Sequence, residues 1–404
     1  MKFRYVLLTS FLFFALIGYV QAADIVIGTF YPMSGGGADL GKSSDEGARL
    51  AAKEINAKGG VIGRQIKILT VDSQAKPDVG VMEAKKYIMK DRVDFLLGGV
   101  SSSVALAVSE LAKEHKKIYM VATSMSDKIT KDKGHRYVFR AQACNSQQAL
   151  SWAILMAKQP GAKTWAAIGP DYEYGHNLWE VFIKKLKELR PDVKISAEVW
   201  PKFGEPNYTS YINAVLQANP DAVFTAFWGG DLINFIKQAK PYGLFEKIKF
   251  PVITGAADLT VVQALKKEMP DNIWCEQRYY FYWPDTERNR NFVKAYQSEY
   301  GKYPAAWAAS AYDGVYYLAT AVEKAKTTST EKVVDALEGL ELDAPRGKSY
   351  IRKCDHQNIF DYAVGKSKWS DQYGFSMATD RVVLPGKEIV YSCEEVEQAR
   401  REAK

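Results

Sequence analysis

The sequence predicts an α/β fold built from two lobes, each a doubly wound parallel sheet with helices on both faces. Short apolar runs alternate with longer amphipathic segments along the chain, which is the pattern of βαβ units. The alternation occurs in two series of similar size, and 404 residues are enough for two or three domains. Hydrophobic residues make up 47% of the chain and charged residues 25%, which is typical of a globular protein with a filled core.

The first residues are typical of a secretory signal peptide, which we place at residues 1–22. Lys2 and Arg4 precede an apolar run over residues 5–20, and the small residue Ala22 follows. This run is short for a membrane span, and no later segment reaches about 18 uninterrupted apolar residues. No cysteine stands near the cleavage point, so we expect no lipid anchor. We therefore expect an exported, periplasmic protein without stable membrane insertion.

Four apolar runs of the first series predict buried parallel strands: "IVIGTF", "IKILTVDS", "DFLLGGV" and "IYMVATS". The segments between and after them predict helices at about 46–57, 78–90 and 103–115. In the first of these helices Ala48, Ala51, Ala52 and Ile55 share one face. This spacing predicts a helix that packs against the sheet.

The second series begins after "YVFRAQACNSQQ". Its predicted strands are "TWAAIGPD", "KISAEVW", "DAVFTAFWGG" and "FPVITGAAD". Predicted helices lie near residues 146–158, 175–190, 207–218 and 231–240, and later near 287–300 and 306–325. In doubly wound folds ligands bind at the carboxyl ends of the strands. The loops expected there contain Gly, Ser, Asp and aromatic residues and no arranged nucleophile.

The stretch "GGADLGKSS", residues 36–44, fits the nucleotide-binding pattern G-x-x-x-x-G-K-[ST]. A phosphate cradle follows its strand directly, whereas five residues intervene here, and Asp39 would bring a carboxylate toward the phosphates. We therefore interpret the stretch as a Gly-rich loop before a helix capped at Ser43, Ser44 or Asp45.

Charge and motifs exclude several classes of function. The net charge is +7, but Lys and Glu are interspersed, so we expect no nucleic-acid partner. The four histidines are not spaced as metal ligands, and we expect no metal and no cofactor. No G-x-S-x-G or H-E-x-x-H motif occurs, and we predict that the protein is not an enzyme.

The chain resembles the type I periplasmic solute-binding proteins of ABC importers, in the branch of the leucine/isoleucine/valine-binding proteins. The most specific segment is "PMSGGGADLGKSSDEGARLAAKEINAKGGVIGR", and "GGVSSS", "YEYG" and "AAWAASAYDGVYYLATAVEKA" extend the resemblance along the chain. It implies a clamshell with three crossovers, with lobe one at 24–142 and 279–350 and lobe two at 143–278 and 351–404. It also implies a monomer that captures a small carboxylate-bearing solute by hinge closure and delivers it to permease subunits. A sensor for a signalling partner is the alternative.

The resemblance also assigns candidate ligand-binding residues. Ser101 or Ser102, together with Ser124 and Ser126, would hold the ligand carboxylate, and Tyr174 in "YEYG" would cover the ligand. Hydroxyl groups and helix N-terminal N–H groups can satisfy an anion without a formal positive charge. The serines could equally cap the helix that begins near Val104.

One position departs from the family. Amino-acid binders of this branch place an acid where this chain has Ala256 or Ala257, with Asp258 next. Either Asp258 pairs with an ammonium group after a one-residue shift, or the ligand has no amino group. Aromatic residues stand at strand ends and just after a crossing between the lobes, and Trp228 and Tyr282 are the candidates among them for ligand contact. These aromatic residues either favour an apolar or aromatic ligand body or form core packing. The ligand class therefore remains open between an apolar or branched-chain amino acid and an aromatic or other organic acid.

Four cysteines in an exported chain can form disulfides. Of the three pairings we favour Cys354 with Cys393, because both lie in the C-terminal segment. This segment extends beyond the shorter members of the family, and we expect it to add strands to lobe two and a helical tail.

Overall fold

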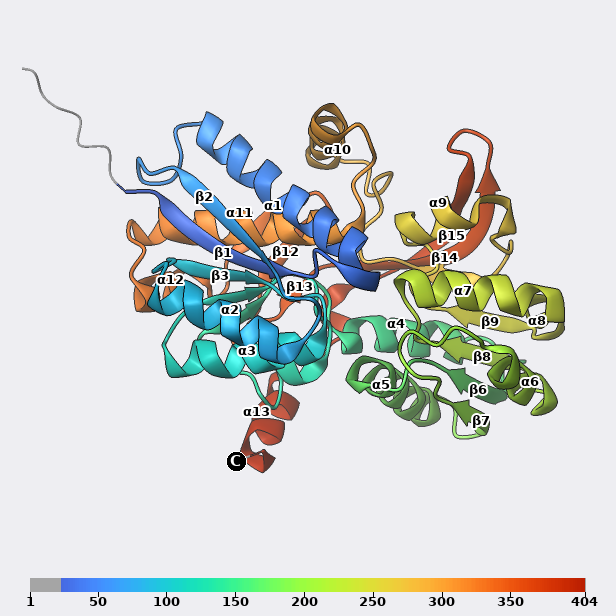
Figure 1. Ribbon diagram of the computed structural model, residues 1–404. Coiled ribbons are helices and arrows are strands. Elements are labelled where there is room, and N and C mark those ends of the chain that lie inside the picture. The colour runs from blue at the N-terminus through green and yellow to red at the C-terminus, as the bar shows by residue number, and fades with distance from the viewer. Residues whose placement is uncertain (1–22, 404) are drawn as a thin grey trace, which may run out of the picture.

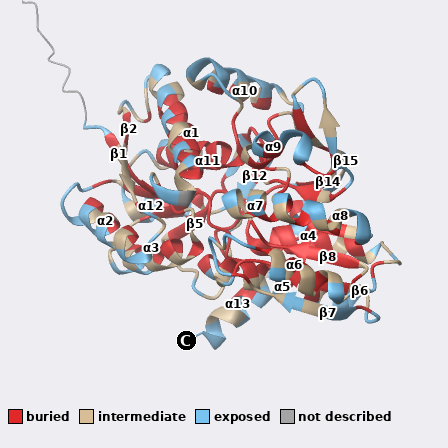
Figure 2. Ribbon diagram, turned by 45° about the vertical axis from the view of Figure 1, so that its right-hand side comes forward, coloured by how far each residue is buried: buried red, intermediate tan, exposed pale blue. Residues whose placement is uncertain are grey.

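Two large sheets lie side by side in the computed structural model, which describes residues 23–403 (Figure 1). The predicted signal peptide lies outside the described residues. The predicted α/β fold of two lobes is confirmed, and the strands at the centre of each lobe are buried (Figure 2). None of the helices in residues 23–403 is long and apolar enough to span a membrane.

The first lobe is built on a five-stranded parallel sheet in the order β2-β1-β3-β4-β5. Its strands are β1 (Ile25–Tyr31), β2 (Ile66–Asp72), β3 (Phe95–Gly98), β4 (Tyr119–Val121) and β5 (Val138–Arg140). One face carries α2 (Pro77–Met89) and α3 (Ser102–Glu114). The other carries α1 (Ala38–Ala57), α10 (Glu287–Tyr300), α11 (Ala306–Ala325) and α12 (Thr330–Leu337). Because both faces are covered, the strands read as the nearly continuous apolar runs seen in the sequence.

The second lobe is built on a seven-stranded sheet in the order β15-β14-β10-β9-β8-β6-β7. Its parallel part consists of β6 (Thr164–Ile168), β7 (Lys194–Val199), β8 (Ala222–Thr225), β9 (Phe250–Ile253) and β10 (Trp274–Glu276). The antiparallel strands β14 (Tyr362–Ser370) and β15 (Phe375–Leu384) extend it, as we expected of the C-terminal segment. One face carries α4 (Asn145–Ala157) and α5 (Glu173–Leu189). The other carries α6 (Thr209–Gln217), α7 (Gly229–Ala239), α8 (Leu244–Lys247) and α9 (Leu259–Leu265).

The chain passes between the lobes after β5, after β10 and before β14. A small antiparallel sheet of β11 (Glu341–Ala344), β12 (Gly347–Ile351) and β13 (Asn358–Ile359) precedes the third passage. This passage therefore lies between Ile359 and Tyr362, several residues after the expected boundary at 350. Beyond β15 the chain returns to the first lobe, where it forms α13 (Cys393–Glu402). Cys354 and Cys393 form a disulfide, while Cys144 and Cys275 are buried free thiols.

The cap predicted for the first helix at Ser43, Ser44 or Asp45 is wrong. The short 3₁₀ helix η1 (Gly35–Gly37) leads directly into α1 at Ala38, so Ser43 and Ser44 lie buried inside the helix. A Cβ atom at Gly41 would come within 1.8 Å of the carbonyl oxygen of Pro32. The glycine of the nucleotide-like pattern therefore permits close packing of the helix on the preceding loop.

The later helices agree with the predicted periodicity. The predicted segments 287–300 and 306–325 coincide with α10 and α11, and the segment 78–90 is shifted by one residue from α2. Further 3₁₀ helices are η2 (Asp127–Ile129), η3 (Lys240–Tyr242), η4 (Lys266–Glu268) and η5 (Gly386–Glu388).

Candidate ligand site between the lobes

A small cavity of about 20 Å³ lies between the two lobes, where loops from the carboxyl ends of their strands meet. Loops after β3 and β4 and the first turn of α11 contribute from the first lobe, and loops after β6 and β8 contribute from the second. The passage after β10 supplies one further residue. The lining residues are Val100, Ser102, Thr123, Met125, Tyr172, Tyr174, Trp228, Arg278 and Trp307.

Aromatic side chains form the second lobe's wall of the cavity. The Trp228 Nε1–H group donates to the hydroxyl oxygen of Tyr172 over 2.7 Å, and the rings of Tyr172 and Tyr174 lie 6.1 Å apart. Phe203 packs on Trp228 with ring centroids 5.1 Å apart, although 53% of its surface is exposed. Burial raises the pKa of Tyr174 to about 12, so this side chain is a neutral donor. The wall offers flat apolar surface to a ligand.

Arg278 brings a positive charge to the cavity. Its guanidinium group lies 4.6 Å from the centre of the Trp307 ring and donates to the Thr123 carbonyl oxygen over 3.3 Å. A longer bond of 3.4 Å reaches Gln142 Oε1. Within residues 23–403 no carboxylate forms a salt bridge with Arg278. The site thus holds a partly buried cation whose strongest kind of partner, a carboxylate, is not supplied by the described chain.

Two acids in the neighbourhood of this arginine, Asp258 and Glu276, accept hydrogen bonds from other groups. Asp258 caps α9, accepting bonds from the backbone and side chain of Thr260 through Oδ1 and from Gln277 and Trp307 through Oδ2. Glu276 accepts from Gln148, Gly255 and Tyr362. Asp258 is 4% exposed and Glu276 is fully buried, and burial raises the pKa of Asp258. Asp258 accepts four bonds, which fill the lone pairs of both its oxygens, and Glu276 accepts three while fully buried, so neither carboxylate is an open partner for a ligand ammonium.

Of the predicted serines, Ser102 lines the cavity and the others do not. Ser102 Oγ accepts from the backbone N–H of Ser126 over 3.2 Å and keeps its hydrogen for another acceptor. Ser124 donates to the carbonyl oxygens of Gly99 and Ser101, so its hydroxyl organises the loop. Ser101 is the N-cap residue of α3 without a side-chain bond, and Ser126 donates to Glu173 Oε1 of the second lobe over 2.9 Å.

Of the remaining predicted residues, two line the cavity and two do not. Tyr174 and Trp228 lie in the cavity wall. Asp258 does not line the cavity, but its carboxylate accepts a hydrogen bond from the indole N–H of Trp307 over 3.0 Å and so positions that ring. Tyr282 accepts from the backbone of Ala378 and lines a separate small cavity near β15.

Sequence reasoning missed Arg278, Trp307 and Tyr172. The signal for Arg278 was its place directly before the aromatic run "YYFYW", and Tyr172 stands two residues before Tyr174. Trp307 had no local signal, because its position in the cavity depends on how α11 packs in the first lobe.

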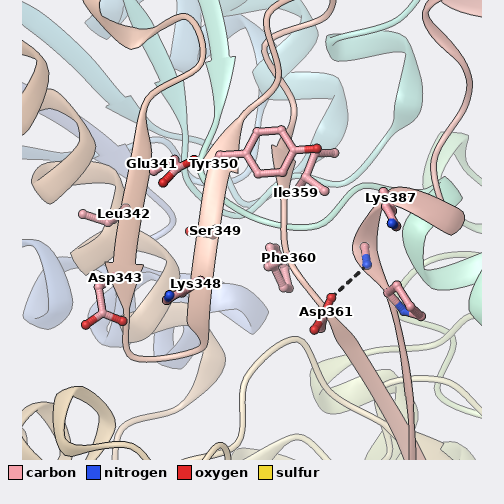
Figure 3. A pocket seen from close by; sticks show the side chains of 12 residues that line it. Glu341, Leu342, Asp343, Lys348, Ser349, Tyr350, Ile359, Phe360, Asp361 and Lys387 are labelled. Carbon is pink, nitrogen blue, oxygen red and sulfur yellow. Dashed lines mark hydrogen bonds between the residues drawn. The ribbon is translucent and has the colours of Figure 1, made fainter.

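Larger hollows lie away from this cavity. One of about 470 Å³ lies between the small sheet and the segment 385–387 (Figure 3). Its charged side chains include Asp343, Lys348 and Lys387, which are exposed, while Asp361 accepts from the backbone of Gly386. Another of about 920 Å³ lies between α3 and α13. Neither hollow combines an aromatic wall with a partly buried cation that lacks a carboxylate partner.

Comparison with known proteins identifies related chains of similar length. A family model described as periplasmic binding protein matches residues 24–372. The leucine-, isoleucine-, valine-, threonine- and alanine-binding protein of Pseudomonas aeruginosa is 23% identical over 348 residues, which cover 86% of this chain and 91% of that protein. The structure of a branched-chain amino acid transporter protein from Rhodopseudomonas palustris has a TM-score of 0.76 at 26% identity, covering 92% and 99% of the two chains.

A solute-binding protein of an ABC transporter from Rhodopseudomonas palustris was solved in complex with 3,4-dihydroxybenzoic acid. It has a TM-score of 0.80 at 24% identity, and the match covers 90% of this chain and 98% of that one. At this identity the match indicates a shared fold.

Proposed function

The chain belongs to the family of periplasmic binding proteins, and we propose that it captures a small carboxylic acid between its lobes for an ABC importer. Members of this family are binding proteins rather than enzymes. The observation that carries the proposal is Arg278, a cation in the interlobe cavity with no carboxylate partner in the described chain. A ligand carboxylate would supply that partner, and hydrogen bonds to charged groups contribute about 1.5–3 kcal/mol each.

The same geometry favours an acid without an amino group. A bound α-amino acid would bring an ammonium group close to Arg278, and Asp258 and Glu276 already accept bonds with all their oxygens. A buried ammonium without an anionic partner is costly. The aromatic wall of Tyr172, Tyr174 and Trp228 favours a flat apolar body. The named relatives bind amino acids in one case and a hydroxylated benzoic acid in another, and the occupied acids favour the second class here.

The route of the ligand follows from the family and the N-terminal sequence. Residues 1–22 direct export to the periplasm, where the mature chain acts as a monomer. Ligand binding draws the lobes together by a hinge motion, and permease subunits receive the closed form. The cavity lies between the lobes, so the lobes must separate to admit an acid.

Matched pairs of acids test this proposal. The mature protein is unfolded and refolded to remove any carried-over solute, and binding is measured by calorimetry. The pairs are 3-phenylpropionate with phenylalanine and 4-methylpentanoate with leucine, with benzoate added as a compact aromatic acid.

We expect the acid of each pair to bind at least about 100-fold more tightly than the amino acid, because an unpaired buried charge costs several kcal/mol. Preference for the amino acids would contradict the proposed ligand class. Binding of none of the acids or amino acids would contradict the proposed function.

A further inference from the structure

A contact that uses no ligand joins the two lobes next to the interlobe cavity, and we call it the latch: Ser126, Lys128 and Glu173. Ser126 follows the lining residue Met125 in the sequence, and Lys128 and Glu173 line the hollow between α3 and α13. Ser126 Oγ donates to Glu173 Oε1 over 2.9 Å, and Lys128 Nζ lies 2.7 Å from Glu173 Oε2. Ser126 and Lys128 belong to the loop after β4 in the first lobe, whereas Glu173 is the first residue of α5 in the second. The hydrogen bond to Glu173 raises the pKa of Lys128. These bonds join the two lobes directly.

The loop that carries Ser126 and Lys128 is long and has little structure of its own. Between β4 and β5 it contains only the single 3₁₀ turn η2. Such a loop loses conformational entropy when it is fixed, so a contact made by it is weak unless something else holds it.

Buried Arg140 holds the first part of this loop by donating to the carbonyl oxygens of Ser124 and Ser126. The C-terminal helix α13 supports the part of the loop that follows Lys128. The guanidinium group of Arg400 donates to the carbonyl oxygens of Thr130, Lys131 and Cys354 over 2.9, 3.0 and 3.0 Å. Two of these acceptors lie two and three residues after Lys128. Lys131 in turn lies over the ring of Tyr391, which precedes α13, with Nζ 3.7 Å from the ring centre.

The helix is itself fixed to the first lobe, at the segment between β12 and β13. The disulfide between Cys354 and Cys393 joins its first residue to the segment after β12. Arg352 of that segment also donates to the Tyr391 carbonyl oxygen over 2.7 Å. Figure 1 shows α13 beneath α3 at the junction of the two lobes.

We propose that α13 is a brace that holds the latch loop ready for closure, with Arg400 as its positioning residue and the Cys354–Cys393 disulfide as its anchor. The brace touches no ligand. It lowers the cost of forming the latch and so strengthens binding of every ligand by the same factor. This proposal rests on the proposed function, because it concerns closure around a bound acid.

The test compares Arg400→Ala with Arg401→Ala, a matched variant on the same helix. Arg401 is exposed and makes one long ion pair of 3.9 Å with Glu397. Binding of benzoate and 3-phenylpropionate is measured for the wild type, both variants, Cys393→Ser, Glu173→Gln and the double variant Arg400→Ala/Glu173→Gln.

We expect Arg400→Ala and Cys393→Ser to weaken both acids equally, by about five- to tenfold, and Arg401→Ala to have no effect. In the Glu173→Gln background the Arg400→Ala effect should largely disappear, because both changes act through the latch. Equal affinities of the Arg400→Ala and Arg401→Ala variants would overturn the brace. If the losses of affinity of Arg400→Ala and Glu173→Gln multiply in the double variant, Arg400 acts independently of the latch. That outcome would also overturn the brace.

Hydrogen exchange separates failure of the brace from failure of the proposed function. Backbone amides of residues 127–131 should exchange faster in Arg400→Ala than in Arg401→Ala without any ligand present. If the wild type binds neither acid but this difference is seen, the proposed ligand class fails and the support of the loop stands. If the exchange rates are equal, the brace is overturned whatever the ligand.

Discussion

The latch pairs both of its charged side chains across the lobes, whereas the neighbouring cavity holds Arg278 without a carboxylate partner in the described chain. Glu173 accepts from Ser126 and Lys128, so the latch is complete within the protein. Arg278 donates only to a carbonyl oxygen and an amide oxygen, over 3.3 and 3.4 Å. If both proposals hold, closure and recognition reside in separate groups. Changes in the cavity should therefore alter which acid binds, and changes in the latch should alter all acids alike.

The largest expected effect is that of Arg278→Gln. The amide keeps hydrogen-bonding capacity but removes the charge, so we expect benzoate affinity to fall by about 100-fold or more. Calorimetry measures the affinity, and the melting temperature serves as a check on folding. Arg278→Lys keeps a point charge without the planar fork and should give an intermediate loss. Wild-type affinity in Arg278→Gln would place the ligand carboxylate elsewhere.

A smaller effect is expected for Trp228→Ala, which removes part of the aromatic wall. Aromatic contacts of this kind contribute about 0.5–1.5 kcal/mol, so benzoate should bind up to about tenfold more weakly. The affinity for 4-methylpentanoate should fall less, and the ratio of the two dissociation constants is the measurement. Trp369→Ala is the matched control, because Trp369 lies on β14 away from the cavity and donates to Asp371. An unchanged ratio would show that the wall does not contact the ligand ring.

The smallest expected effect concerns pH. Burial lowers the pKa of His135, which lies in the loop between β4 and β5, to about 4, while its unfolded value is near 6.5. Between these values the unfolded chain binds a proton that the folded chain does not, so stability falls as pH is lowered through this window. The melting temperature should drop by a few degrees more in the wild type than in His135→Gln between pH 7 and 4.5.

Ligand affinity at the interlobe cavity should depend on pH much less than the melting temperature does. No histidine is among its lining residues, so benzoate affinity should change little between pH 8 and pH 6. Parallel melting curves of wild type and His135→Gln would show that this histidine is not the titrating group.

Much of the fold could be predicted because its signals are local. The buried strands read as apolar runs, and the helical stripe of Ala48, Ala51 and Ala52 lies in α1 as expected. The start of α1 was misjudged because a glycine-rich segment looks like a loop, and its packing against Pro32 cannot be seen in the sequence. Strands β11–β13 were missed because they are short, and β11 and β12 are also partly exposed.

The candidate site could be predicted only in part, because several of its residues take their roles from contacts with distant parts of the chain. Ser102, Tyr174 and Trp228 follow strand ends, where the sequence locates ligand loops. The roles of Ser124, Ser126 and Asp258 depend on partners up to 49 residues away, such as Trp307 for Asp258. Arg278 and Trp307 come from a passage between lobes and from a helix start, and only the folded chain brings them together.

The location of Arg278 on the second passage between the lobes also bears on kinetics. Residues near the axis of a hinge move least when the two bodies rotate, so an acid held by Arg278 keeps its first contact while the cleft widens. The aromatic wall and the latch separate earlier in the same motion. Release would therefore be governed by the last bond, at the hinge, and the residence time of the ligand would depend on Arg278 more than on the width of the cleft.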